Sequence, residues 1–276
     1  MAGDITVDVK DGIATITLNR PETLNALTRA DYDAFAKSLR EIDQRPDVVV
    51  TIWQAHGRFF CAGTNVADSA SVIASKEAAE ADRSDPRKVF PSAVFPTNTD
   101  VSNALYTHSK LLVAAVNGPV LGIAAAFLGF FDFIYAMPSV YLSVPFTFLG
   151  LISEAGSSVS FVNRMGLARA NEVLLLRKRL GADDLLQCGF VNKIFPAEPA
   201  EKFHATVRAH VQYELEGLDP TALLAVKRLI RAGLNEKNNP DAVNMRESYE
   251  QASRIASGIP AQQFSRLARK EIKNRL

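Results

Sequence analysis

Apolar and polar residues alternate along residues 5–18, on both sides of Asp11-Gly12, and this alternation predicts a β-hairpin that turns at the Asp-Gly pair. Residues 27–43 carry apolar side chains at helical spacing, and residues 47–53 form an apolar run that is typical of a buried strand. Because a strand, a helix and a second strand follow one another, we expect a βαβ unit.

The middle of the chain continues this mixture of strands and helices. Strands are predicted at residues 111–122 (ending in a turn), 132–137 and 140–144, and a helix at residues 123–131. A further helix is expected to begin near Ser153. Residues 66–100 are polar and contain three prolines, so we expect short helices and surface loops there.

The C-terminal part becomes helical from Asp183 onward. Asp219-Pro220 marks the start of one helix, and the helical pattern that follows Asp241 is expected to end at Gly258. These patterns predict an α/β fold with a mostly helical C-terminal region.

Composition narrows the possible partners. The chain has 276 residues, of which 47% are hydrophobic and 22% charged, which is enough for a large single core and ordinary for a globular protein. A net charge of +1 provides no general attraction for nucleic acid or for membranes. The most apolar stretch is interrupted by Asn117, Gly118, Pro119 and Asp132, which argues against a transmembrane helix.

The cysteines and histidines show no metal or disulfide pattern. Cys61 and Cys188 lie far apart without ligand-like spacing, so we expect free thiols in a reducing compartment. We expect structural or surface roles for the four histidines, His56, His108, His204 and His210. The N-terminal residues MAGDITVDVK lack the features of a signal or transit peptide, so an intracellular protein is expected.

One carboxylate, that of Glu154, ends the apolar stretch in VPFTFLGLISEAGSS, at a predicted helix start. If Ser153 is the N-cap, Glu154 is a first-turn acid that the helix dipole stabilises. The same residue is also a candidate catalytic acid or base. The local residues leave both interpretations open.

Two glycine-bearing turns, GRFFCAGTN at residues 57–65 and NGPVLGIAAA at residues 117–126, each follow an apolar strand. Turns of this kind expose backbone N–H groups, and two such donors that converge on one oxygen form an oxyanion hole. Either turn alone is more simply a connection between a strand and a helix.

Together, four segments resemble the crotonase, or enoyl-CoA hydratase/isomerase, superfamily in their order and spacing. These segments are LNRPETLNALT, GRFFCAGTNVAD, AAVNGPVLGIAAAF and LGLISEAGSS, and the similarity covers about residues 5–196. The resemblance implies a crotonase-like spiral of ββα units over residues 1–196 and a helical trimerisation region over residues 197–276. It also implies a homotrimer or a dimer of trimers, an acyl-CoA substrate, and no cofactor beyond the CoA of that substrate.

The resemblance assigns the oxyanion donors to the backbone N–H groups of Thr64 and Ile123. Hydratases that resemble this chain carry two glutamates, at positions that Ala126 and Phe146 hold here. Adding water to a double bond requires one group to deprotonate the water and another to manage the α-carbon proton. The two apolar residues therefore argue against efficient hydratase chemistry.

Glu154 stands where peroxisomal-type Δ3,Δ2-enoyl-CoA isomerases of this superfamily carry their catalytic glutamate, in a similar LGLI-x-E-x-G context. One carboxylate can remove a proton from C2 of a 3-enoyl-CoA and return it at C4, while two N–H groups hold the dienolate oxygen. If Phe146, Phe148, Leu149 and Leu151 line the pocket, they would desolvate Glu154 and raise its pKa. The resemblance favours the catalytic interpretation of Glu154.

Several residues are candidates for supporting roles at the acid. Asn98 could orient Glu154 directly or through water, as in similar isomerases, or it could bond only to its own loop backbone. Ser157 and Ser158 could donate hydrogen bonds to Glu154, although serines at a helix start need no such role.

Substrate contacts are suggested by the resemblance at further positions. These are the backbone near Ala26, Leu27 and Ala62 for CoA, the side chain of Phe146, and Lys270 or Lys273 for the CoA phosphates of a neighbouring subunit. The basic tail could equally be a solvated helix face. The final Asn274-Arg275-Leu276 is similar to a degenerate peroxisomal signal of the SKL kind, so a peroxisomal location is expected, and otherwise a cytoplasmic one.

Two departures leave substrate specificity open: Thr64-Asn65 stands where many relatives have Ala-Asp, and Ala155 where Gly is common. One alternative function is another enoyl-CoA or acyl-CoA activity, such as a hydratase or a specialised biosynthetic enzyme. A dienoyl-CoA isomerase would need a second acid, for which Asp68 and Asp100 are the loop candidates. The other alternative is a non-catalytic binding protein for a partner or RNA, against which the near-zero net charge argues.

Overall fold

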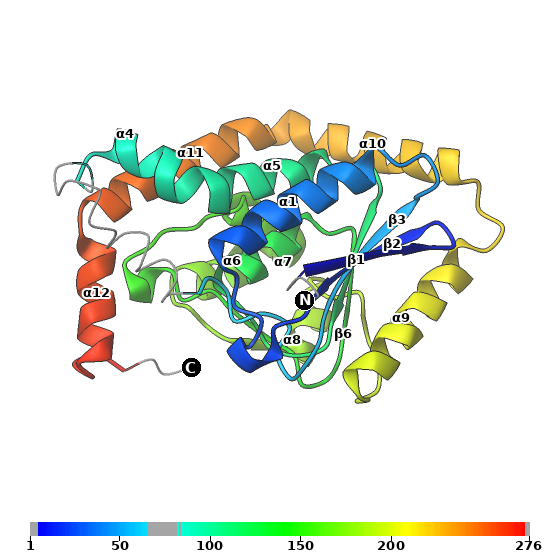
Figure 1. Cartoon of the computed structure of the whole chain (residues 1–276), viewed down its shortest axis with the longest axis horizontal. Helices are drawn as coiled ribbons and strands as arrows, with labels where there is room; N and C mark the ends of the chain where they lie inside the picture. The colour runs from blue at the N-terminus through cyan, green and yellow to red at the C-terminus, as the bar shows by residue number, and fades with distance from the viewer. Residues whose placement is uncertain (1–4, 66–81, 83, 274–276) are drawn as a thin grey trace.

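The computed structural model describes residues 5–65, 82 and 84–273, and Figure 1 shows how its elements are arranged. Asp68 and the C-terminal Asn274-Arg275-Leu276 lie outside the described residues. Within the described ranges, no helix is both long and apolar enough to cross a membrane. The same ranges contain no group of three side chains suited to hold a metal ion.

The larger of two sheets has six strands in the order β1-β2-β3-β4-β6-β9. Their bounds are Ile5–Lys10, Ile13–Leu18, Val50–Ala55, Leu111–Val116, Phe133–Ala136 and Lys193–Ile194. β1 and β2 form the expected hairpin, and Asp11 (φ 51°) and Gly12 (φ 74°) both adopt the left-handed conformation that a tight hairpin turn requires. All other pairs are parallel, and β2 and β3 are joined by α1 (Arg29–Asp43), which confirms the βαβ unit.

A smaller sheet joins β5 (Val120–Leu121), β7 (Tyr141–Ser143) and β8 (Leu180–Gly181). A strand of the large sheet, a strand of the small sheet and a helix follow one another twice, as β4-β5-α6 and β6-β7-α7. The helices α6 (Gly122–Phe127), α7 (Ser157–Leu174, kinked at Gly166) and α8 (Ala182–Gln187) complete these turns of the chain. The expected α/β fold with a spiral of ββα units is confirmed.

The other helices surround this spiral (Figure 1). They are η1 (Pro21–Thr23), α4 (Pro86–Val89), η2 (Phe90–Thr99), α5 (Asp100–Thr107), η3 (Leu128–Phe130) and η4 (Thr147–Leu149). The C-terminal region adds α9 (Ala200–Leu215), α10 (Pro220–Lys237), α11 (Pro240–Ala256) and α12 (Ile259–Ala268). As expected, Asp219 caps α10, and Gly258, at φ 73°, follows the end of α11. The elements α10 and α11 run along the same side of the molecule as α1 and α5.

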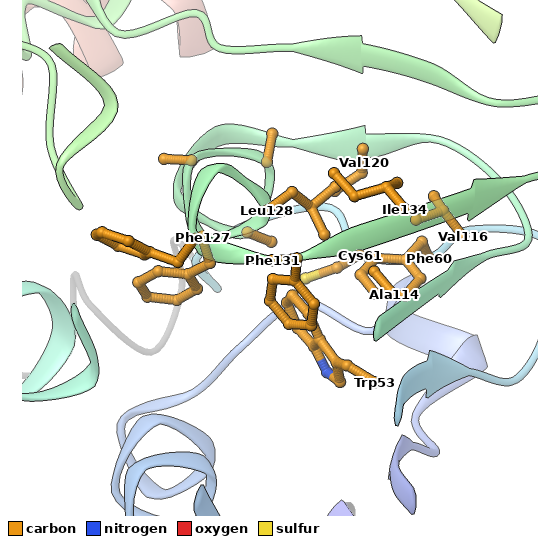
Figure 2. Packing of buried hydrophobic residues seen from close by; sticks show 14 of the residues in the cluster. Trp53, Phe60, Cys61, Ala114, Val116, Val120, Phe127, Leu128, Phe131 and Ile134 are labelled. Atoms are coloured by element: carbon orange, nitrogen blue, oxygen red, sulfur yellow. The ribbon is translucent and has the colours of Figure 1, made fainter. Parts of the chain in front are cut away.

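Alternate residues of the central strands enter two different hydrophobic clusters, because successive side chains of a strand point to opposite faces. On one face, Trp53 is the centre of an aromatic group. Its ring stacks on Phe35 and Phe131 at centroid distances of 4.8 and 5.6 Å and meets Phe60 edge-on at 4.7 Å (Figure 2). On the other face, α9 covers the sheet with Phe203, Val207 and Val211.

One local expectation is wrong. The helix expected near Ser153 begins at Ser157, because Ala155 (φ 56°) and Gly156 (φ 69°) take left-handed conformations in which a helix does not start. Glu154 therefore precedes the helix, and the interpretation as a first-turn acid capped by Ser153 is excluded. The short helices expected in residues 66–100 are confirmed where the structure describes that range, by α4 and by the π-helix η2, which contains Pro96.

Gly118 lies in the turn between β4 and β5, and we expect that replacing it with alanine destabilises the fold. A Cβ atom there would lie 2.2 Å from the carbonyl oxygen of Arg58, so backbone would have to move. We predict a loss of about 1–3 kcal/mol in the free energy of unfolding, measured by denaturant titration. At Gly181, where a Cβ would meet nothing within 4 Å, replacement with alanine should change the free energy of unfolding by less than about 1 kcal/mol. Equal losses at both positions would contradict this account.

Candidate active site

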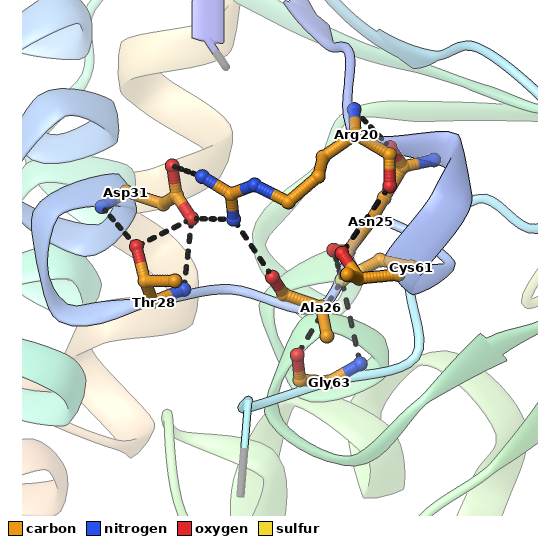
Figure 3. Close-up of polar contacts among 8 residues, drawn as sticks. Arg20, Asn25, Ala26, Thr28, Asp31, Cys61 and Gly63 are labelled. Atoms are coloured by element: carbon orange, nitrogen blue, oxygen red, sulfur yellow. Dashed lines mark hydrogen bonds and ion pairs between the residues drawn. The ribbon is translucent and has the colours of Figure 1, made fainter. Parts of the chain in front are cut away.

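The loop that follows β2 is fixed by an ion pair between Arg20 and Asp31 (Figure 3). The Arg20 guanidinium donates to both Asp31 carboxylate oxygens, at 2.6 and 3.2 Å, and to the carbonyl of Ala26 at 3.2 Å. Asp31 also accepts a hydrogen bond from the backbone N–H of Thr28 at 2.8 Å, as part of the capping box at the N-terminus of α1. The segment before α1 is therefore held in one conformation.

The side chain of Asn25 attaches this loop to the first glycine-bearing turn. Its Nδ2 donates to the carbonyls of His56 and Phe59 at 2.8 and 2.9 Å. The Cys61 thiol donates to the carbonyl of Asn25, at 3.0 Å (Figure 3). Burial raises the pKa of Cys61 to about 12, so the group remains a thiol and serves as a hydrogen-bond donor.

Backbone pairing joins the segments expected to contact CoA. Leu27 donates its N–H to the carbonyl of Gly63 at 2.8 Å, and Ala62 donates to Leu24 at 3.0 Å. The segment with Ala26 and Leu27 is thus paired with the segment that carries Ala62. The N–H groups of Leu27 and Ala62 are engaged within it, so a contact to CoA would use other atoms of these residues. Their role in binding CoA stays a prediction.

The two glycine-bearing turns lie against each other. Leu121 donates its N–H to the carbonyl of Cys61 at 2.9 Å. A Cβ on Gly63 would lie 3.0 Å from the carbonyl oxygen of Leu121 and 3.7 Å from the Cα of Gly122. Both glycines have positive φ, 88° and 57°, so glycine allows the close approach as well as the backbone conformation.

This contact brings together the residues that follow the two glycines, Thr64 and Ile123. In the described ranges, no carbonyl accepts a hydrogen bond from either N–H group. For Ile123 this follows from its place in the first turn of α6, where N–H groups have no partner within the helix. Both N–H groups thus lack a described carbonyl partner, and their convergence into an oxyanion hole stays a prediction.

Glu154 lies in the turn between η4 and α7 and is 8% exposed. Its Oε2 accepts hydrogen bonds from Asn98 Nδ2 at 3.1 Å and from Gln251 Nε2 at 2.9 Å. Burial raises its pKa to about 8, with a further rise from the charge of Glu247, while the bond from Gln251 opposes the rise. Glu154 is thus a buried acid whose described hydrogen-bond donors are both neutral.

Asn98 orients Glu154 directly. It projects from the π-helix η2, and its Oδ1 accepts the backbone N–H of Ala155 at 2.9 Å while its amide group donates to Glu154. The alternative, in which Asn98 bonds only to its own loop, is wrong.

Tyr32 contacts the first of the two glycine-bearing turns and lies close enough to Glu154 to respond to its charge. Its hydroxyl lies 2.6 Å from Thr64 Oγ1, and its pKa is raised chiefly by burial and further by the negative charge of Glu154. Phe130, which follows α6, packs so closely on the turn after Glu154 that a Cβ on Gly156 would lie 2.6 Å from its ring. The helix η3, which directly follows the helix of Ile123, therefore packs against the turn that carries the acid.

Two residues of α11 belong to this site and were not expected from the sequence. Besides Gln251, the buried carboxylate of Glu247 accepts the backbone N–H groups of Gly156 and Ser158, at 2.6 and 3.0 Å. Burial raises its pKa. A signal was present in the sequence: the polar residues Asn244, Glu247, Ser248 and Gln251 follow one another at the three- and four-residue spacing of one helix face.

Other expected contacts at the acid are not formed. The Ser157 hydroxyl donates to the backbone carbonyl of Glu154, at 2.6 Å, and the Ser158 N–H donates to Glu247, so neither reaches the Glu154 carboxylate. Asp100, a candidate second acid, forms an ion pair with Arg40 at 2.6 Å. Asp68, the other candidate, lies outside the described residues.

The remaining candidates differ in position. Ala126 and Phe146, at the positions of the hydratase acids, are both buried. Lys270 and Lys273 are exposed beyond the end of α12, and the structure of one chain leaves their role in CoA binding a prediction. Cys61 and Cys188 are free thiols, as expected.

Comparison with known proteins points to one family. The family profile described as enoyl-CoA hydratase/isomerase matches residues 8–256. A Delta(3,5)-Delta(2,4)-dienoyl-CoA isomerase of Pyricularia oryzae is 36% identical over an alignment of 282 positions that covers 100% of both chains. A 3,2-trans-enoyl-CoA isomerase of Saccharomyces cerevisiae is 33% identical over 95% of this chain and 92% of its own. The mouse "Enoyl-CoA delta isomerase 3, peroxisomal" is 29% identical over 96% of this chain and 77% of its own.

Solved structures agree with this result. The crystal structure of an enoyl-CoA hydratase/isomerase from Pseudoalteromonas atlantica superimposes with a TM-score of 0.81 at 26% sequence identity, over 99% of this chain and all of that one. Its similarity extends through the helical C-terminal region as well as the spiral. The crotonase fold expected from the sequence is therefore confirmed.

The raised pKa of Glu154 predicts how its replacement changes stability with pH. The native state binds the Glu154 proton up to a pKa of about 8, against an ordinary value of 4.5 in the unfolded chain. Wild type therefore loses stability as pH rises from about 4.5 through 8, because ionisation of the buried group is disfavoured only in the native state. Glu154→Gln has no proton to lose and should not show this decrease. Its free energy of unfolding relative to wild type should therefore rise by at least about 2 kcal/mol between pH 5 and pH 8.5, since each pKa unit corresponds to about 1.4 kcal/mol.

Denaturant titrations at the two pH values measure this difference. Glu250→Gln makes the same change at an exposed position of α11 and serves as the control. A gap between Glu154→Gln and wild type that stays constant with pH would show that Glu154 titrates normally.

Proposed function

The chain belongs to the enoyl-CoA hydratase/isomerase family, and we propose that it is an enoyl-CoA isomerase that moves the double bond of a 3-enoyl-CoA from C3 to C2. The observation that carries this proposal is the buried carboxylate of Glu154, which two neutral amides orient and whose charge acts on Tyr32, the hydrogen-bond partner of Thr64. The name of the yeast relative, 3,2-trans-enoyl-CoA isomerase, supports it.

The proposed reaction needs one acid and one oxyanion site. The Glu154 carboxylate removes a proton from C2, and the electron pair of the C2–H bond passes into the thioester as a dienolate. The N–H groups of Thr64 and Ile123 hold the dienolate oxygen. The Glu154 carboxylic acid then protonates C4, and the electrons return to form the C2=C3 double bond. No cofactor takes part beyond the CoA that the substrate carries.

Burial makes the Glu154 carboxylate a stronger base than a solvated glutamate, because it raises the pKa to about 8. The buried Ala126 and Phe146 at the hydratase positions offer no group to deprotonate a water molecule. The site therefore supports proton transfer between carbons of the substrate better than it supports hydration.

A second candidate is the isomerisation of a 3,5-dienoyl-CoA to a 2,4-dienoyl-CoA. The Pyricularia relative carries that name, and Glu247 is a second buried acid beside Glu154. Both carboxylate oxygens of Glu247, however, accept backbone N–H groups. We therefore favour the reaction that needs one acid.

The decisive assay follows conjugated 2-enoyl thioester formed from a 3-enoyl-CoA. Glu154→Gln keeps the shape of the side chain but removes the base, so we expect kcat to fall at least about 1,000-fold while CoA binding persists. Glu250→Gln, at an exposed position of α11, should retain wild-type activity. Activity that survives in Glu154→Gln would contradict the assignment of the base. Turnover of a 3,5-dienoyl-CoA alone, lost in Glu247→Gln, would favour the second candidate.

We also propose that the protein assembles as a homotrimer or a dimer of trimers through its C-terminal helices. The exposed side of α10 carries four large apolar residues, Val226, Leu229, Ile230 and Leu234, which are 42–69% exposed in a single chain. An apolar stripe of this kind on a soluble surface is typical of an association site. Such an assembly would also provide the neighbouring subunit that Lys270 or Lys273 could reach.

A charged variant of this stripe tests the assembly. The double substitution Leu229→Glu and Ile230→Glu should convert the oligomer to monomers, because each buried carboxylate at the interface costs several kcal/mol. Light scattering at matched concentration measures the mass. Lys237→Glu, at the end of the same helix, should leave the mass unchanged. A wild-type protein that is already monomeric would contradict the proposal.

The location in the cell stays a prediction. The mouse relative is named as peroxisomal, which supports a peroxisomal location for this chain. The candidate signal at residues 274–276 lies outside the described residues.

A further inference from the structure

The helix α11 faces the proposed active site with polar residues. Its buried face consists largely of Asn244, Glu247, Ser248 and Gln251, at positions where a packed helix ordinarily carries apolar side chains. Asn244 donates to the carbonyl of Thr99, and Ser248 accepts from the Thr99 hydroxyl, at 2.9 and 2.8 Å. These bonds fasten α11 to the end of η2, one residue beyond Asn98.

Gln251 occupies the point of this face that meets Glu154, and two hydrogen bonds determine the orientation of its amide. Its Oε1 accepts the backbone N–H of Ile152 at 3.2 Å, so its Nε2 points to the Glu154 carboxylate, where it donates at 2.9 Å. Asn98 is oriented in the same way by the N–H of Ala155. Backbone N–H groups on both sides of the acid therefore direct both amides toward it.

Both amides donate to the same carboxylate oxygen, Oε2. In the part of the chain that the structure describes, nothing donates to Oε1, and the fully enclosed side-chain atoms that lack a partner do not include it. The small exposed part of Glu154 therefore includes Oε1. A carboxylate that is held through one oxygen keeps the lone pairs of the other free to take a proton.

We propose that Gln251 is a positioning residue of the reaction: with Asn98 it anchors Oε2 of Glu154, so that Oε1 is the atom that carries the proton from C2 to C4. This inference rests on the proposed function. As the C2–H bond breaks, an O–H bond forms at Oε1, and that bond breaks again as the C4–H bond forms. The amide bonds to Oε2 persist throughout. The C-terminal helix is therefore part of the active site.

The test compares Gln251→Met, which keeps the length of the side chain but removes both its donor and its acceptor, with wild type. In Gln251→Met the carboxylate of Glu154 loses one anchor and should shift, so we expect kcat to fall about 10- to 100-fold. KM should change little, since Gln251 contacts the base and not the substrate. The pH at which kcat/KM reaches half its maximum should rise, because the lost bond stabilised the ionised carboxylate. Gln262→Met, at an exposed position of α12, is the matched control and should behave as wild type.

A titration that does not depend on turnover separates this inference from the proposed function. Carbon-13 NMR of labelled glutamate, with the Glu154 signal identified by its absence in Glu154→Gln, should show a higher pKa in Gln251→Met than in wild type. Should Gln251→Met fail to fold, Gln251→Asn carries the test, because it keeps the amide but is one methylene too short to bridge Ile152 and Glu154.

The outcomes are distinct. A raised pKa without turnover of any 3-enoyl-CoA in wild type would support the anchoring of Glu154 and reject the proposed reaction. An unchanged titration with unchanged kcat would overturn the role of Gln251. A lower kcat with an unchanged titration would also overturn it, since Gln251 would then act only on the folding of α11.

Discussion

The burial of one carboxylate without a described cationic partner is the constraint on which the rest of this site depends. An acid removed from water is driven toward its neutral form, and a nearby second carboxylate drives Glu154 further in that direction. Amide donors oppose this drive only in part, so the pKa settles at about 8. A guanidinium or ammonium in the place of Asn98 or Gln251 would hold the acid ionised but make it a weaker base.

The turn that presents this acid needs support of its own. Ala155 has a positive φ of 56°, which costs a residue with a Cβ about 1–2 kcal/mol. Glu247 stabilises the turn by accepting hydrogen bonds from the N–H groups of Gly156 and Ser158. These lie at the N-terminus of α7, where the helix dipole favours a negative charge. The same carboxylate raises the pKa of Glu154. One side chain of α11 thus contributes both to the geometry and to the basicity of the site.

The sequence correctly predicted those elements whose structure is determined by residues close together in the chain. The Asp11-Gly12 hairpin, the βαβ unit and the Asp219-Pro220 helix start are of this kind. The start of α7 was misplaced because Ser153 and Glu154 match an N-cap pattern, whereas the left-handed backbone after Glu154 depends on contacts with α11. The family resemblance supplied Glu154 and Asn98, and the structure shows that these two residues are in contact.

Gln251 escaped prediction for a physical reason. It lies 97 residues from Glu154 in the chain, so no local spacing relates the two, and the resemblance ended before its helix. The two halves of the site accordingly have separate supports: the Arg20–Asp31 pair and Asn25 fasten the loops before Thr64, while η2 and α11 hold the acid. An acid supported in this way can change in kind or position without disturbing the N–H pair. In the proposed reaction, the donors to the dienolate oxygen and the acid therefore depend on different parts of the fold.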